Sequence, residues 1–128
     1  MKTIVALLTL NTLEDTKSVL DSTGIGRVEI YTDFDLTTLS LTLNSGEFLS
    51  IELIKDAEVE DSKEMTEFYR KVMNGHFFGI HWTDVNALKL VVRSFGSRIL
   101  GLYYDEGDVT NYTIEVHTLE EFIQTHIM

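Results

Sequence analysis

The sequence contains neither cysteine nor proline. Without cysteine the chain can form no disulfide framework, no thiolate zinc site and no cysteine nucleophile. Without proline, its turns have to be made by Gly, Asn, Asp or Ser. A chain without disulfides suits a reducing compartment, and we therefore expect a cytoplasmic protein.

Long apolar runs are also missing. A membrane-spanning helix needs about 20 consecutive apolar residues, and no segment approaches that length. The segment 3–10 is apolar but short, contains two threonines and leads into Asn11 and Glu14 without a small-residue cleavage site. We predict that this segment is a buried strand rather than a signal peptide.

Basic residues are few. The 10 Lys and Arg stand against 21 Asp and Glu, which gives a formal net charge of −11. Phosphate backbones and anionic membranes repel such a surface, so we expect no direct binding of nucleic acid or membrane. The 128 residues, of which 44% are hydrophobic, suffice for a packed core. No linker-like segment divides them, and we predict a single domain over residues 1–128.

Three helices are predicted from capping boxes, in which a short polar residue precedes a glutamate by three positions. The boxes begin at Asn11, Asp61 and Thr118. The first helix should end near Gly24, because glycine favours the left-handed conformation of a helix C-terminus. The second should run to Asn74-Gly75, and the third should occupy the C-terminal segment.

Between these helices apolar and polar residues alternate with a period of two, which is typical of strands with one covered face. The alternation predicts strands over 28–31, 39–43, 49–53, 88–93 and 111–116, and a more continuous apolar run predicts another over 98–104. Segments 44–46 and 105–108 are predicted as hairpin turns, and 76–82 has no clear assignment. The expected fold class is α+β, with an antiparallel sheet of about six strands in meanders packed against two or three helices.

Few residues suggest chemistry. His76 and His81, followed by Asp84, have the residue types of a metal site. Five positions apart on a strand they would face opposite ways, so we expect ordinary hydrogen-bonded histidines and no metal. The sequence has no phosphate-binding glycine loop, nucleophile elbow or triad order, so we predict no catalytic residue and no cofactor.

Acidic residues are unevenly placed. Segment 28–54 contains five acids and no Lys or Arg, and segment 99–128 contains six acids and no Lys or Arg. If these stretches share a surface, it would attract a basic protein partner and hold it with tyrosine anchors. The sequence Tyr103-Tyr104-Asp105-Glu106 resembles the interface composition of colicin immunity proteins. The predicted partner-binding residues are Glu29, Tyr31, Asp33, Glu52, Tyr103, Tyr104, Asp105, Glu106, Asp108 and Glu115.

The predicted function is that of a non-enzymatic acidic inhibitor of the immunity-protein or phage anti-defence type. It would block a basic partner, either a toxin or a nucleic-acid-binding enzyme. The alternative is a small-molecule-binding or enzymatic α+β domain with an aromatic pocket near residues 76–82, lined by Phe77, Phe78 and Trp82. A structural subunit of an oligomer and an acidic surface that serves solubility alone are further alternatives.

Overall fold

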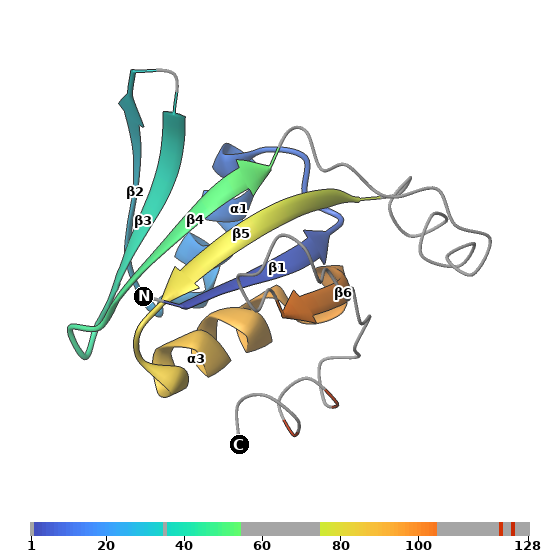
Figure 1. Cartoon of the computed structure of the whole chain (residues 1–128). Helices are drawn as coiled ribbons and strands as arrows, with labels where there is room; N and C mark the ends of the chain where they lie inside the picture. Colours follow the sequence, from blue (N-terminus) through green and yellow to red (C-terminus); the bar gives the residue numbers. More distant parts are fainter. Residues whose placement is uncertain (1, 35, 55–74, 105–120, 122–123, 125–128) are drawn as a thin grey trace.

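The computed structural model describes residues 2–34, 36–54, 75–104, 121 and 124. They form six strands, two α-helices and one short 3₁₀ helix (Figure 1). The strands are β1 (Lys2–Leu8), β2 (Gly26–Asp33), β3 (Leu36–Leu43), β4 (Phe48–Ile54), β5 (His76–Trp82) and β6 (Ile99–Tyr104). The helices are α1 (Leu13–Thr23), α3 (Val85–Phe95) and the 3₁₀ helix η2 (Gly96–Arg98).

The strands make one sheet in the order β2-β3-β4-β5-β1-β6, and every neighbouring pair is antiparallel. The α+β class and the meander of β2, β3 and β4 are therefore confirmed. Strand β1, the first in the chain, lies between β5 and β6. Since β5 and β6 are both antiparallel to β1, they run parallel to each other, and α3 provides the crossover between them.

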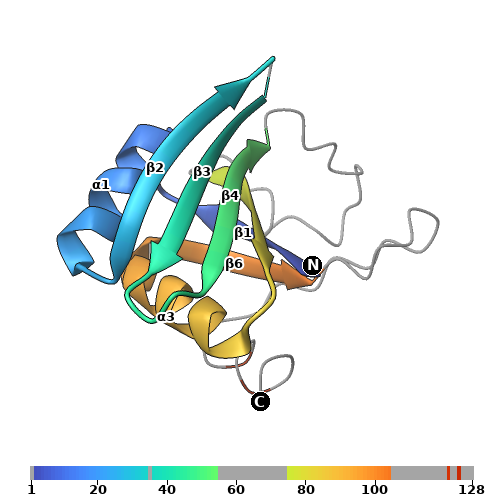
Figure 2. The ribbon, with the colours of Figure 1, turned by 90° about the vertical axis from the view of Figure 1, so that its left-hand side faces the viewer.

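One face of the sheet carries the core. The register aligns apolar residues across five strands, and Ile30, Leu39, Ile51, Ile80 and Ile4 form one such row. Helices α1 and α3 lie beside each other against this face (Figures 1 and 2). They add Leu20 and Phe95, which are fully buried. Burying a large apolar side chain stabilises a protein by roughly 1.5–3 kcal/mol, so this layer is the main source of stability.

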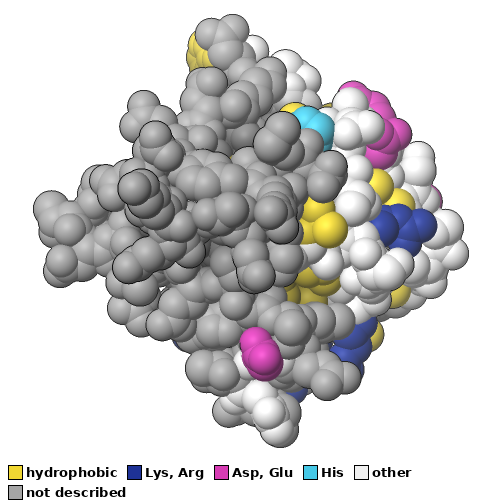
Figure 3. All heavy atoms as spheres, turned by 90° about the vertical axis from the view of Figure 1, so that its right-hand side faces the viewer, with side chains coloured by type: hydrophobic (Ala, Val, Ile, Leu, Met, Phe, Trp, Pro, Cys, Tyr) yellow, Lys and Arg dark blue, Asp and Glu magenta, His cyan; other side chains and the backbone are white. Residues whose placement is uncertain are grey.

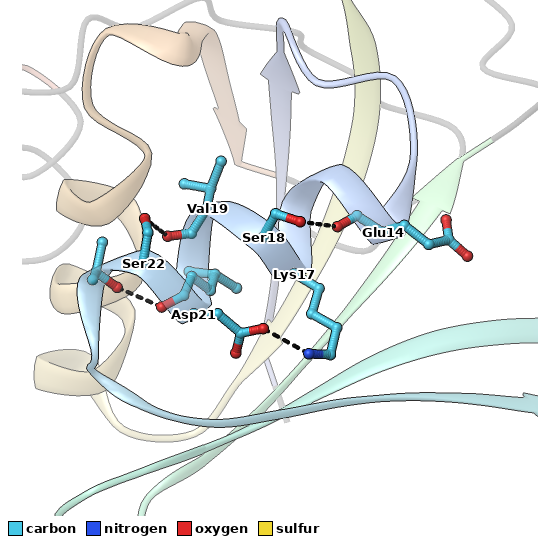
Figure 4. Close-up of polar contacts among 8 residues, drawn as sticks. Glu14, Lys17, Ser18, Val19, Asp21 and Ser22 are labelled. Atoms are coloured by element: carbon cyan, nitrogen blue, oxygen red, sulfur yellow. Dashed lines mark hydrogen bonds and ion pairs between the residues drawn. The ribbon is translucent and has the colours of Figure 1, made fainter.

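Helix α1 begins and ends where local signals place it. Thr12 is the N-cap, and its hydroxyl accepts a hydrogen bond from the Asp15 amide at 3.1 Å. The cap is one residue later than the Asn11 predicted from the capping box. Gly24 ends the helix in the left-handed conformation, as predicted. On the outer surface Lys17 pairs with Asp21 at 2.6 Å (Figure 4).

The predicted strand over 88–93 is wrong, because this segment is part of α3. The side chain of Asp84 caps the helix by accepting a hydrogen bond from the Ala87 amide at 3.0 Å. Leu88, Val91 and Phe95 are fully buried and recur at the three- and four-residue spacing of a helix. The alternation that suggested a strand required Leu90 to be buried as well.

The unassigned segment 76–82 is β5, a strand in the middle of the sheet. The turn predicted at 44–46 connects β3 to β4, with Gly46 at a φ of 100°. The predicted helices after Asp61 and Thr118, the strand 111–116 and the turn 105–108 lie outside the described residues, residues 121 and 124 apart. In the described part of the chain no helix is long and apolar enough to cross a membrane.

Candidate functional site

The sheet face opposite α1 and α3, called here the second face, carries mostly polar side chains. One row across five strands consists of Glu29, Ser40, Ser50, His81 and Thr3. The next row consists of Tyr31, Thr38, Glu52, Gly79 and Val5. The two rows bring together residues that are up to 78 positions apart in the chain, and two hydrogen-bonded clusters form on them.

The first cluster joins three neighbouring strands. The hydroxyl of Thr3 on β1 lies 2.8 Å from Nδ1 of His81 on β5. Nε2 of the same ring lies 3.1 Å from a carboxylate oxygen of Glu52 on β4. Glu52 is diagonal to His81 across the pair of strands, a separation that long side chains bridge. The side chains of His81 and Glu52 keep 27% and 33% of their surface exposed, so solvent reaches the cluster.

The second cluster lies along β2, at the edge of the described sheet. Arg27 pairs with one oxygen of the Glu29 carboxylate, and the hydroxyl of Tyr31 donates a hydrogen bond to the other. The hydrogen bond from Tyr31, and to a smaller degree the Arg27 guanidinium, lowers the pKa of Glu29. The same hydrogen bond raises the pKa of Tyr31, because ionisation of the hydroxyl would remove the donor and place two negative charges together.

The predicted partner-binding residues fall into three groups. Glu29, Tyr31 and Asp33 alternate along β2 and therefore share the second face, where Glu52 lies two strands away from Tyr31. Tyr103 and Tyr104 are consecutive in β6 and pair with Val5 and Ile4, so their positions belong to opposite faces. The remaining four lie outside the described residues: Asp105, Glu106, Asp108 and Glu115.

Charge on the second face is more mixed than the distribution along the sequence suggests. Arg27 directly precedes the base-free segment and lies on the same face as the acids. It pairs with Glu29, while His81 contacts Glu52. Figure 3 shows acidic and basic side chains as small separate groups on one side of the molecule. Among the described residues, most of the acids are divided between the second face, with Glu29, Asp33 and Glu52, and α1, with Glu14, Asp15 and Asp21, and they form no uniformly negative surface.

Exposed apolar side chains concentrate at the far end of the β2–β3 hairpin. Tyr31, Phe34 and Leu36 are 54%, 96% and 57% exposed. Phe34 also has a φ of 54°, in the left-handed region that non-glycine residues seldom adopt. The hairpin end projects beyond the neighbouring strands (Figure 1). Neither Phe34 nor Leu36 is among the predicted partner-binding residues, although an aromatic residue within a turn is a usable signal.

The aromatic segment 76–82 does not form one lining. Phe78 and Trp82 belong to the buried core under the helices, while Phe77 lies on the second face. His76 pairs with Leu8 and His81 with Thr3, which places the two histidines on opposite faces, as predicted. Within the described residues no group of three or more His, Cys, Asp or Glu side chains could hold a metal ion.

The chain matches no protein-family model. No curated protein and no solved structure matches it either. The two clusters and the hairpin end are therefore the features that bear on function.

Proposed function

We propose that this chain is a protein-binding inhibitor, of the immunity-protein or phage anti-defence type, that blocks a basic nucleic-acid-processing partner. The contact surface is the end of the β2–β3 hairpin, defined by Tyr31, Asp33, Phe34 and Leu36. The single observation that carries the proposal is the exposure of Phe34, at 96%, in a strained backbone conformation.

The cost of this arrangement supports a functional reading. A non-glycine residue in the left-handed region costs roughly 1–2 kcal/mol. Phe34 recovers none of this cost by burial, because its side chain stands in solvent. Residues in sparsely populated backbone regions cluster at active sites, ligand clamps and switch regions. Aromatic side chains that become buried on association are also the usual energetic centres of protein interfaces.

Charge determines which partner fits. The chain has a formal net charge of −11, and Asp33 is exposed beside the apolar anchors. Such a surface attracts a basic protein over distances of about one Debye length, and the attraction weakens with salt. Because Glu29 and Glu52 already contact Arg27 and His81, we assign the binding energy mainly to the anchors. The negative charge then serves the rate of association.

The proposal is tested by affinity capture from lysate of the source cells, followed by an activity assay of each captured protein. The full chain is compared with a Tyr31→Ala/Phe34→Ser double variant. The matched control is Leu90→Ser, since Leu90 is 46% exposed but lies on α3. We expect a basic protein that the full chain and the control retain and inhibit, with affinity falling as salt rises. Capture that is equal for the hairpin variant and the full chain contradicts the proposal.

A further inference from the structure

Thr3, His81 and Glu52 form a hydrogen-bonded cluster that has no part in the proposed binding through the hairpin end. A hydroxyl, an imidazole and a carboxylate follow one another in a continuous hydrogen-bonded line. Both distances, 2.8 Å and 3.1 Å, fall within the range that joins a nucleophile to its base and the base to the group that orients it. Unrelated hydrolytic sites share this order, whatever the position of the residues in the sequence.

In a neutral His81 ring, the two hydrogen bonds favour one position of the proton. An ionised carboxylate only accepts hydrogen bonds, so the nitrogen facing Glu52, Nε2, carries the hydrogen. Nδ1 then has a free lone pair and accepts the hydrogen bond from the hydroxyl of Thr3. This neutral tautomer is the one that can remove a proton from that hydroxyl.

Solvent reaches the side chains of the cluster, which are partly exposed. Thr3 is half-buried, and His81 and Glu52 are exposed by 27% and 33%. Helices α1 and α3 pack against the opposite face. Both hydrogen bonds are partly buried. A neutral hydrogen bond adds about 0.5–1.5 kcal/mol to stability, and one to a charged group about 1.5–3 kcal/mol.

We propose that Thr3, His81 and Glu52 form a catalytic site that hydrolyses small, uncharged carboxylic esters. Nδ1 of His81 takes the proton of the Thr3 hydroxyl while Oγ1 forms a bond to the ester carbonyl carbon. The ester C–O bond then breaks, and the leaving alcohol receives the proton from His81. Glu52 stabilises the positive charge that the ring carries between these two transfers.

A water molecule completes the reaction. His81 takes a proton from this water, whose oxygen attacks the acyl carbon. The bond between Thr3 and the acyl group breaks, a carboxylic acid leaves, and the hydroxyl of Thr3 regains its proton. The carboxylate of Glu52 and the net charge of −11 repel anionic substrates, which is why we assign uncharged esters rather than phosphate esters.

The test measures hydrolysis of 4-nitrophenyl acetate by the purified full chain. Thr3→Val removes the hydroxyl with little change of shape, and we expect it to lower the rate above buffer by about 100-fold. Glu52→Gln should also lower the rate, whereas Thr3→Ser should retain activity. The matched control is His76→Gln, which removes an exposed imidazole from the opposite face of the same strand and should leave the rate unchanged.

Two results overturn the proposal: no hydrolysis above buffer by the full chain, or an unchanged rate in Thr3→Val. Circular dichroism shows whether Thr3→Val folds. If it does not, peptide mapping of the acetylated full chain decides. An acetyl group on Thr3 supports the site, and acetyl groups on lysines without any on Thr3 overturn it. The outcome is separate from that of the inhibitor proposal, since none of these substitutions touches the hairpin end.

Discussion

The hydroxyl of Tyr31 donates a hydrogen bond to the carboxylate of Glu29, two residues earlier on the same face of β2. Arg27, a further two residues earlier, pairs with the other oxygen of that carboxylate. The period of two along a strand brings these three side chains into line. Glu29 therefore contacts both Arg27 and the aromatic side chain of Tyr31. The pKa at which Tyr31 ionises depends on the contact with Glu29.

We predict that Glu29→Gln lowers the pKa at which Tyr31 ionises. The raised pKa of Tyr31 means that its contribution to folding is complete below the ordinary tyrosine value of about 10 and is lost as pH rises through the raised value. Ultraviolet absorbance of tyrosinate against pH measures the change. In Glu29→Gln one of the tyrosines should ionise at a lower pH than in the full chain. The control variant Glu47→Gln, in the β3–β4 turn, should leave the titration curve unchanged. Superimposable curves for the full chain and Glu29→Gln would contradict the contact.

The carboxylate responds in the opposite direction. Because the pKa of Glu29 is lowered, its contribution to folding is present above the ordinary glutamate value and disappears as pH falls through the lowered value. The Glu29 side chain is 35% exposed, so the change in stability is small, and carbon NMR of the Glu29 carboxyl is the suitable measurement. In Tyr31→Phe, which removes the stronger of the two influences, the pKa of Glu29 should rise. Unchanged titration in that variant would leave Arg27 as the main cause.

Substitutions of Asp84 test α3, the helix found where a strand over 88–93 was predicted. Its side chain accepts the hydrogen bond of the Ala87 amide, which has no partner within the first turn of α3. We expect Asp84→Ala to lower the free energy of unfolding by about 1 kcal/mol in urea denaturation. Asp84→Asn keeps an oxygen that can accept the bond and should lose less. Equal losses in both variants would show that the charge rather than the cap matters.

Much of the fold could be predicted because its signals are local. Thr12 and Gly24 bound α1 within a few residues of the predicted ends, and alternation marked β2, β3 and β4. Strand β5 had no alternation, since aromatic and apolar residues point to both faces in the middle of the sheet. The place of β1 between β5 and β6 depends on pairings between distant segments, which no local pattern encodes.

In the candidate site, too, some relationships follow from a local pattern and others depend on pairings between distant segments. That Glu29 and Tyr31 share a face follows from their spacing alone. The contact of Thr3, His81 and Glu52 requires β4, β5 and β1 to be neighbours in a particular register, and a shift of one residue would turn His81 to the other face. The sequence pattern predicts that His81 is hydrogen-bonded, but it does not identify the two partners.

Gly26 allows β2 and β3 to approach closely at the start of their pairing. A Cβ atom at this position would lie 2.2 Å from the carbonyl oxygen of Thr42 and 2.7 Å from Cα of Leu43. Both are backbone atoms, so the strands themselves would have to move. We expect Gly26→Ala to lower the urea midpoint more than Gly24→Ala, whose Cβ would meet nothing within 4 Å and which carries only the strain of a φ of 66°. A larger fall of the urea midpoint in Gly24→Ala would mean that β2 and β3 can move apart at Gly26 at little cost in stability.

The same substitution, leucine to alanine, at Leu88 and at Leu90 distinguishes the predicted strand over 88–93 from the helix α3. In the predicted strand both side chains would face the core, and replacing either with alanine would cost a similar amount. In α3 Leu88 is fully buried, whereas Leu90 is 46% exposed. We therefore expect Leu88→Ala to lower the free energy of unfolding by about 2–5 kcal/mol, and Leu90→Ala by about 0.5 kcal/mol, near the level of a surface substitution. Urea denaturation with a common slope for the two variants measures the difference directly. Similar losses of stability at both positions would support the predicted strand over 88–93. The core face of β4 and β5 would then have to be covered by an element other than α3.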